Sequence, residues 1–147
     1  MKTRFKTLFL MTVLVSFSAT AQQAQQFGDY VVHYNALSTS LLTPGVAKAY
    51  GIKRSDSRAL INISVLKSAN DLPHTAAKSR VTASGRNLTG QTRNIDMREI
   101  NDGDGAIYYI GELSVRNMET FTFTVTILPE GQGKPFDLKF RQQFYTE

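Results

Sequence analysis

The chain has 147 residues and no cysteine, which excludes disulfides, thiolate metal sites and cysteine nucleophiles. This length is typical of one domain and suffices to bury a core without covalent cross-links. The formal charge is +5, but Lys2, Arg4 and Lys6 lie in a segment that we expect to be removed. Removing them leaves 14 basic against 12 acidic residues, which gives no reason to expect nucleic-acid binding.

The first 21 residues have the pattern of a cleaved signal peptide. Three basic residues precede an apolar run, Leu8 to Phe17, and small residues follow at Ala19 and Ala21. The run is too short to cross about 30 Å of hydrocarbon, and there is no cysteine to carry a lipid anchor. We expect cleavage after Ala21, a polar linker over 22–28 and one domain over 29–147. The mature protein would be periplasmic in a bacterium and would not span the membrane.

The first part of the domain predicts one strand and the only helix that we expect. Apolar residues alternate from Asp29 to Asn35, which is typical of a strand. Farther on, Thr43 can cap a helix, Pro44 suits the first helical position, and Gly51 can take the left-handed conformation that ends it. These signals predict a helix of about two turns.

The middle of the chain contains a strong strand followed by weaker signals. Ala59 to Leu66 is apolar on both faces, which predicts a central strand, and Asn70 to Pro73 reads as a turn. Beyond it we expect a short strand around Val81 and Ala83. A turn at Ser84 to Asn87 and another strand over Gln91 to Arg98 would follow.

The last part gives the clearest strand pattern. Asn101 to Gly105 predicts a tight hairpin because Asn, Asp and Gly tolerate positive φ. A strand over Ala106 to Leu113 and a turn at Arg116 to Glu119 lead into Phe121 to Leu128. There, Phe, Val and Ile alternate with Thr. A loop over 129–135 then precedes a last strand whose apolar face holds Phe136, Leu138, Phe140 and Phe144.

Short strands at this spacing favour an all-β fold, an immunoglobulin-like antiparallel β-sandwich of about seven strands with one short helix. The cysteine pair and tryptophan of antibody domains are missing, so only the architecture carries over. A small open β-barrel is the alternative.

The sequence predicts no catalytic residue, no metal site and no cofactor. His33 and His74 are the only histidines, and nothing in their spacing makes them converge. A strand histidine that makes one local hydrogen bond is the simpler interpretation. Asp102-Gly103-Asp104-Gly105 has part of a calcium-loop pattern but lacks a third oxygen ligand before its glycine, so a hairpin turn explains it better. The Gly-x-Ser-x-Gly elbow of many hydrolases is absent.

One stretch concentrates positive charge against the single acid Asp96. Such a cluster can dock an anionic surface such as lipopolysaccharide, phospholipid head groups or an acidic protein, or it can simply be a solvated face. The candidate basic surface consists of Lys78, Arg80, Arg86, Arg93 and Arg98.

Several segments resemble a known family, the bacterial domain-of-unknown-function family 4426 of small secreted Gram-negative proteins. The resemblance extends in order over the whole mature length to a final Phe/Leu strand. It implies a periplasmic β-sandwich without assigned activity, and it supplies no catalytic residues. The segments that carry it are Val32 to Ala36, Leu42 to Pro44, Val46-Ala47, Ala49 to Ile52, Arg54-Ser55, Asn62 to Val65 and Gln142 to Phe144.

A mixture of aromatic and polar residues around the helix forms the candidate binding site: His33, Tyr34, Asn35, Tyr50 and Arg54. A purely structural explanation competes with this one. In that case, both tyrosines belong to the core, the asparagine satisfies backbone at a strand end, and the arginine pairs with Asp56 or Asp29.

Two functions from different classes remain. We favour a noncatalytic binding or assembly module that engages an envelope protein, or an anionic lipid or glycan, through a sheet edge or its basic face. The alternative is a small hydrolase or ligand-binding enzyme with its site near the helix, which requires those side chains to converge in a pocket.

Overall fold

The computed structural model describes residues 23–69 and 72–147, and the predicted signal peptide lies outside these residues. The described chain contains ten strands, more than the seven expected, one 3-10 turn and one α-helix. The strands are β1 (Gln23–Phe27), β2 (Tyr30–Ser38), β3 (Arg58–Ala69), β4 (Leu72–Ala76), β5 (Ser79–Asn87), β6 (Thr92–Ile95), β7 (Arg98–Asn101), β8 (Ile107–Ser114), β9 (Glu119–Pro129) and β10 (Phe136–Phe144). The helical segments are η1 (Thr39–Leu41) and α1 (Pro44–Ala49).

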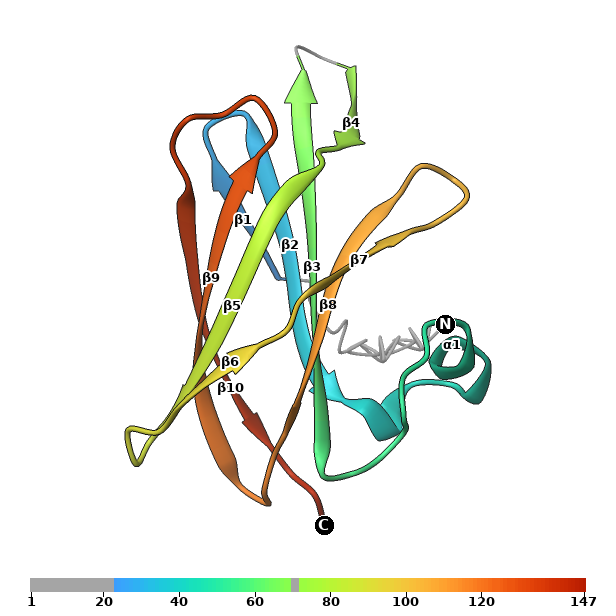
Figure 1. The fold of residues 1–147 in the computed structure, drawn as a ribbon, viewed down its shortest axis with the longest axis vertical. Helices are drawn as coiled ribbons and strands as arrows, with labels where there is room; N and C mark the ends of the chain where they lie inside the picture. The colour runs from blue at the N-terminus through green and yellow to red at the C-terminus, as the bar shows by residue number, and fades with distance from the viewer. Residues whose placement is uncertain (1–22, 70–71) are drawn as a thin grey trace, which may run out of the picture.

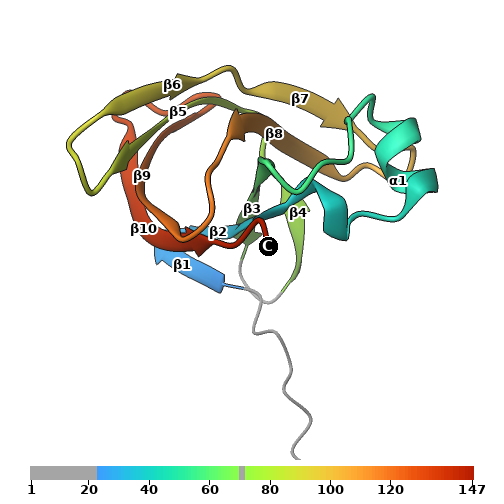
Figure 2. The same ribbon diagram turned by 90° about the horizontal axis from the view of Figure 1, so that it is seen from below.

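The strands form two antiparallel sheets that face each other, as Figures 1 and 2 show. The larger sheet has the order β1-β2-β3-β8-β7, with β4 also paired to β3. The smaller sheet has the order β10-β9-β5-β6. The predicted β-sandwich is therefore confirmed, and the alternative of a barrel is wrong because the two sheets remain separate.

Strand β9 supplies the centre of the core, as its alternation predicted. Phe121, Phe123, Val125 and Ile127 are fully buried, while the threonines between them lie on the opposite face. The ring of Phe123 packs 5.1 Å from that of Phe140 on the neighbouring strand. Burying an apolar side chain of this size contributes about 1.5–3 kcal/mol, so this strand anchors the smaller sheet to the larger one.

The turn expected at Ser84 to Asn87 is wrong, because β5 continues straight through Gly85. A Cβ atom at this glycine would lie only 2.9 Å from the ring of Phe123, so the glycine allows a close approach to the core. The reversal occurs just beyond it, where Gly90 has a φ of +85° and its amide bonds to the carbonyl of Asn87.

The single strand expected over Gln91 to Arg98 is also wrong. It divides into β6, which pairs with β5 in the smaller sheet, and β7, which pairs with β8 in the larger sheet. The chain crosses between the sheets at Asp96 and Met97, directly over Gly111. A Cβ at Gly111 would lie 2.5 Å from Ile95 and 2.6 Å from Met97, so only glycine leaves room for this crossing.

Within the segment interpreted as a polar linker, residues 23–27 form the edge strand β1. Its four N-terminal residues are exposed, which explains the missing apolar alternation, and only Phe27 turns inward onto Phe136. A two-residue turn joins β1 to β2, and Gly28 has the positive φ, +56°, that this kind of hairpin requires at its first central position. At the predicted Asn70–Pro73 turn, residues 70–71 lie outside the described part, and Leu72 already begins β4.

The expected helix and the expected hairpin are both confirmed. Thr43 caps α1 by accepting a hydrogen bond from the amide of Val46, Pro44 is its first residue, and Gly51 follows with a φ of +65°. Between β7 and β8, the amide of Asp102 bonds to the carbonyl of Ala106 at 2.9 Å. The helix covers part of the outer face of the larger sheet.

Candidate functional site

Strand β2 carries three of the five residues expected beside the helix, and it presents them to different sides of the larger sheet. Tyr34 packs against the core, with its ring 4.7 Å from that of Phe140. His33 and Asn35 alternate with it and lie on the outer face, where Asn35 is opposite Asn62 of β3. Together with Asn62 they line a cavity of about 280 Å³.

The remaining two residues lie elsewhere. Tyr50 ends α1 and lines a neighbouring apolar cavity of about 260 Å³ between the helix and the sheet. Arg54 is exposed and donates a 3.0 Å hydrogen bond to the carbonyl of Ser40, and neither of the ion pairs among the described residues involves it. Within the described chain no hydrogen bond connects His33 to Tyr50 or Arg54, so the five residues do not converge as a catalytic site requires.

Two buried polar atoms on this outer face have no hydrogen-bond partner among the described residues, namely His33 Nδ1 and Asn62 Oδ1. The local hydrogen bond expected for a strand histidine is therefore not formed at Nδ1. A buried polar group without a partner costs about 1–3 kcal/mol. A hydrogen-bonding molecule would consequently gain more here than on an ordinary solvated surface.

The candidate basic surface separates into two groups. Arg80 and Arg86 are exposed on the outer face of the smaller sheet, and Lys78 is exposed just before β5. Arg93 instead pairs with Glu119 at 3.8 Å and donates to the carbonyl of Ser114, while its guanidinium lies 5.5 Å from the ring of Phe121. Arg98 donates to the carbonyl of Tyr50, which ties α1 to β7. Arg93 and Arg98 therefore hold elements together, and they do not join the other three on one face.

The fold adds two basic residues that sequence reasoning missed. Arg141 of β10 and Arg86 of β5 both lie opposite Thr122 of the intervening β9, and Lys139 lies opposite Thr124. Neither of the ion pairs among the described residues uses any of these basic side chains. Only the strand register brings them together, and no local sequence signal gives that register. We call the set Arg80, Arg86, Lys139 and Arg141 the basic face.

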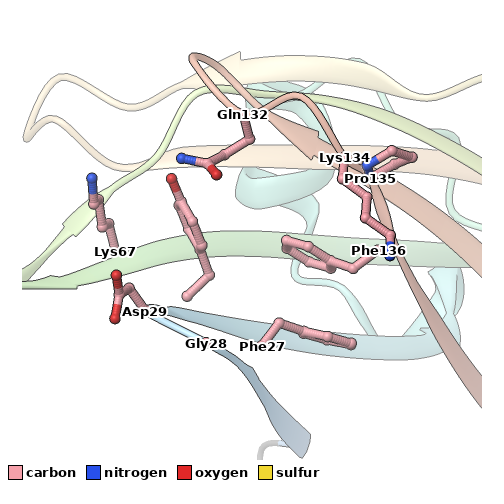
Figure 3. Close-up of a pocket in the computed structure, with 9 residues that line it drawn as sticks. Phe27, Gly28, Asp29, Lys67, Gln132, Lys134, Pro135 and Phe136 are labelled. Carbon is pink, nitrogen blue, oxygen red and sulfur yellow. The ribbon is translucent and has the colours of Figure 1, made fainter.

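A cleft opens at one end of the sandwich, between the β1–β2 turn and the β9–β10 loop (Figure 3). Its aromatic wall is formed by Phe27 and Phe136, whose rings stack with centroids 4.3 Å apart, and by Tyr30, whose ring is 6.1 Å from that of Phe136. The volume is about 480 Å³. We call it the end cleft, lined by Phe27, Gly28, Asp29, Tyr30, Lys67, Gln132, Lys134, Pro135 and Phe136.

Charged and amide groups surround the aromatic wall of the end cleft. The ammonium group of Lys67 lies 5.9 Å from the ring centre of Tyr30, and Lys134 contributes a second positive charge. Asp29 and Gln132 add hydrogen-bonding groups that are exposed to solvent. Figure 3 shows Lys67 and Asp29 on one side of the cleft and the stacked rings of Phe27 and Phe136 on the other. The cleft can thus contact an apolar surface and an anionic group at the same time.

Neither helical segment of residues 23–69 and 72–147 has the length and hydropathy needed to cross a bilayer.

Comparisons with known proteins identify a family and a similar solved structure. The model of the domain of unknown function DUF4426 matches residues 24–147. The crystal structure of a DUF4426 family protein from Pseudomonas aeruginosa PAO1 is 30% identical, with a TM-score of 0.71. The similarity covers 84% of this chain and 94% of that one. A comparison with the curated proteins finds no match.

Proposed function

Since the chain belongs to the DUF4426 family, whose function is unknown, we propose from its surface chemistry that it is a noncatalytic module that binds an acidic glycan in the end cleft. In this proposal the mature protein works in the bacterial periplasm, the compartment that the signal-peptide pattern predicts. The observation that carries the proposal is the aromatic wall of Phe27, Tyr30 and Phe136 beside the ammonium groups of Lys67 and Lys134.

The two halves of the end cleft match the two halves of an acidic sugar. A pyranose ring has a face of C–H groups that packs on aromatic rings, and its carboxylate or phosphate ester pairs with an ammonium group. Asp29 and Gln132 offer an acceptor and an amide to the sugar hydroxyls. The volume of about 480 Å³ lies within the range of small-ligand pockets, about 300–1,000 Å³.

The proposal is for binding and not for hydrolysis. Glycosidases usually place two carboxylates on either side of the scissile bond. The described residues that line the end cleft include one carboxylate, Asp29. A glycan is favoured over a membrane surface because a single sugar unit fits between two loops, whereas a planar array of lipid head groups does not enter the cleft.

Calorimetric titration with an oligogalacturonate, with neutral maltotetraose as the comparison ligand, tests the proposal. We expect saturable binding of the acidic oligosaccharide and at least about tenfold weaker binding of the neutral one. The double variant Lys67→Ala/Lys134→Ala should weaken acidic binding by about tenfold. Lys48→Ala/Lys53→Ala, an exposed pair with one lysine in α1 and one just after it, should not change it.

The same titration separates the end cleft from the basic face. Arg86→Ser/Arg141→Ser removes two charges from the basic face and should change the affinity for oligogalacturonate by less than about twofold. The proposal is wrong if maltotetraose binds equally well. It is also wrong if the basic-face variant loses as much affinity as the lysine variant, or if only vesicles of anionic phospholipid bind.

A further inference from the structure

The outer face of the larger sheet has two adjoining cavities beside α1 that the proposed function does not use. Asn62 and Tyr108 line both of them. Asn62 lies on this face because its neighbours Ile61 and Ile63 point into the core and are fully buried. Val46 of α1 lines one cavity, and no residue of α1 lines the other. Because the two cavities share Asn62 and Tyr108, they form one continuous lining, which we call the outer groove.

The two parts of the outer groove differ in chemistry. The part beside α1 is apolar apart from Asn62 and the two tyrosines, and its walls include Leu42, Leu60 and Ile110. The part farther from the helix contains His33, Asn35 and Ser64 next to Asn62. The volumes are about 260 Å³ and 280 Å³. This division matches a molecule with a short apolar chain at one end and a polar group at the other.

Both residues that carry the unsatisfied atoms described above, His33 and Asn62, line the polar part. The amide oxygen of Asn62 accepts hydrogen bonds, and His33 Nδ1 donates or accepts according to the tautomer. No lysine, arginine, aspartate or glutamate occurs among the described residues that line either cavity. An anionic head group would lose its hydration here without gaining a counter-charge, so an uncharged head group with a donor and an acceptor fits best.

We propose that the outer groove binds a small uncharged amphiphile, with an alkyl chain under α1 and a primary amide head group on Asn62 and His33. Octanamide, octanoate and octane-1,2-diamine serve as probes that share a chain length and differ in the charge and number of their polar groups. The site is distinct from the end cleft, so its test does not depend on the glycan proposal.

Titration of the ¹⁵N-labelled protein with octanamide, followed by NMR, tests this inference. We expect saturable shift changes at Leu60, Asn62, Tyr108 and Ile110, and at least about tenfold weaker binding of octanoate and of the diamine. Val46→Glu places a carboxylate on the apolar part from an exposed helix position, and it should abolish octanamide binding without unfolding the protein.

A second variant tests the head-group contacts. Asn62→Leu has nearly the same size but no amide, and it should weaken octanamide binding by about tenfold. Asn94→Leu, at an exposed position on β6, is the matched control and should leave binding unchanged. The inference is wrong if octanamide causes no saturable shift, if octanoate binds as tightly, or if Val46→Glu and Asn62→Leu both retain the original affinity.

Discussion

The backbone amide of Ser79 donates a 2.7 Å hydrogen bond to the phenol oxygen of Tyr109, and this bond joins β5 of the smaller sheet to β8 of the larger one. Both residues are buried. The phenol hydroxyl in turn donates to a carboxylate oxygen of Glu99 at 3.4 Å. A polar contact of this kind inside a sandwich fixes how one sheet is placed on the other, since the apolar contacts around it are not directional.

Tyr109→Phe should destabilise the protein at neutral pH by about 1–3 kcal/mol, because the buried amide of Ser79 loses its acceptor. Burial raises the pKa of the Tyr109 phenol above its ordinary value of 10.0, and the nearby Glu99 carboxylate adds to this rise, while the hydrogen bond from Ser79 lowers it. The folded state therefore holds this proton more tightly than the unfolded state does.

The protonation of Tyr109 changes the free energy of unfolding with pH in one definite direction. The stability contributed by the protonated phenol is complete below pH 10.0 and is lost as the pH rises through the higher folded-state pKa. Urea titrations from pH 7 to pH 11 should show the stability difference between the original protein and Tyr109→Phe becoming smaller above about pH 10. A difference that stays constant over this range would contradict the prediction.

Gly85→Ala should destabilise the protein by about 1–3 kcal/mol, because the new methyl group meets the rings of Phe123 and Phe121, and both rings are fully buried. Replacing glycine removes unfolded-state entropy, which contributes only about 0.4–1 kcal/mol in the opposite direction. Thermal unfolding measures the net effect. Gly133→Ala is the control, since its methyl group meets open space and should leave the melting temperature equal or slightly higher.

Thr39→Val should destabilise the protein by weakening the contacts of the segment that joins β2 to α1. The buried hydroxyl of Thr39 donates to the carbonyl of Lys53 at 2.9 Å and accepts from the amide of Ser55 at 2.9 Å. Valine keeps the volume and removes both contacts, so we expect a loss of about 1–3 kcal/mol in urea denaturation. Thr92→Val, at an exposed strand position, should change stability by less than about 0.5 kcal/mol.

A double-mutant cycle on Phe27 and Phe136 should give a coupling free energy of about 0.5–1.5 kcal/mol, the range for stacked aromatic pairs. The measurement compares the unfolding free energies of Phe27→Leu, Phe136→Leu and the double variant with that of the original protein. Additive effects would mean that β1 packs on β10 without a specific ring contact.

The features that could be predicted from sequence are those whose signals are local. The alternation in β9 predicted its buried face because neighbouring residues on a strand point in opposite directions. The cap at Thr43 and the positive φ at Gly105 likewise depend on a few adjacent residues, so the helix and the hairpin were confirmed. Together, these local signals were enough to predict a β-sandwich.

The features that the sequence predicted wrongly, or did not predict at all, depend on contacts between distant segments. A glycine in a strand looks like a turn until the ring that approaches it is known, and this explains the error at Gly85. Nothing near Asp96 indicates that the chain leaves one sheet for the other, because both halves have strand-like sequences. The end cleft could not be predicted either, since its two stacked rings, Phe27 and Phe136, come from opposite ends of the chain.

The crossing at Asp96 and Met97 has a mechanical consequence. Three connections of the described chain pass from one sheet to the other: β4 to β5, β6 to β7, and β8 to β9. The connection from β6 to β7 joins the two sheets covalently along one long side of the molecule, whereas β1 and β10 belong to different sheets and lie near each other on the other side (Figure 2). The chain itself thus holds one long side of the sandwich together, whereas packing such as the stacked rings of Phe27 and Phe136 holds the other.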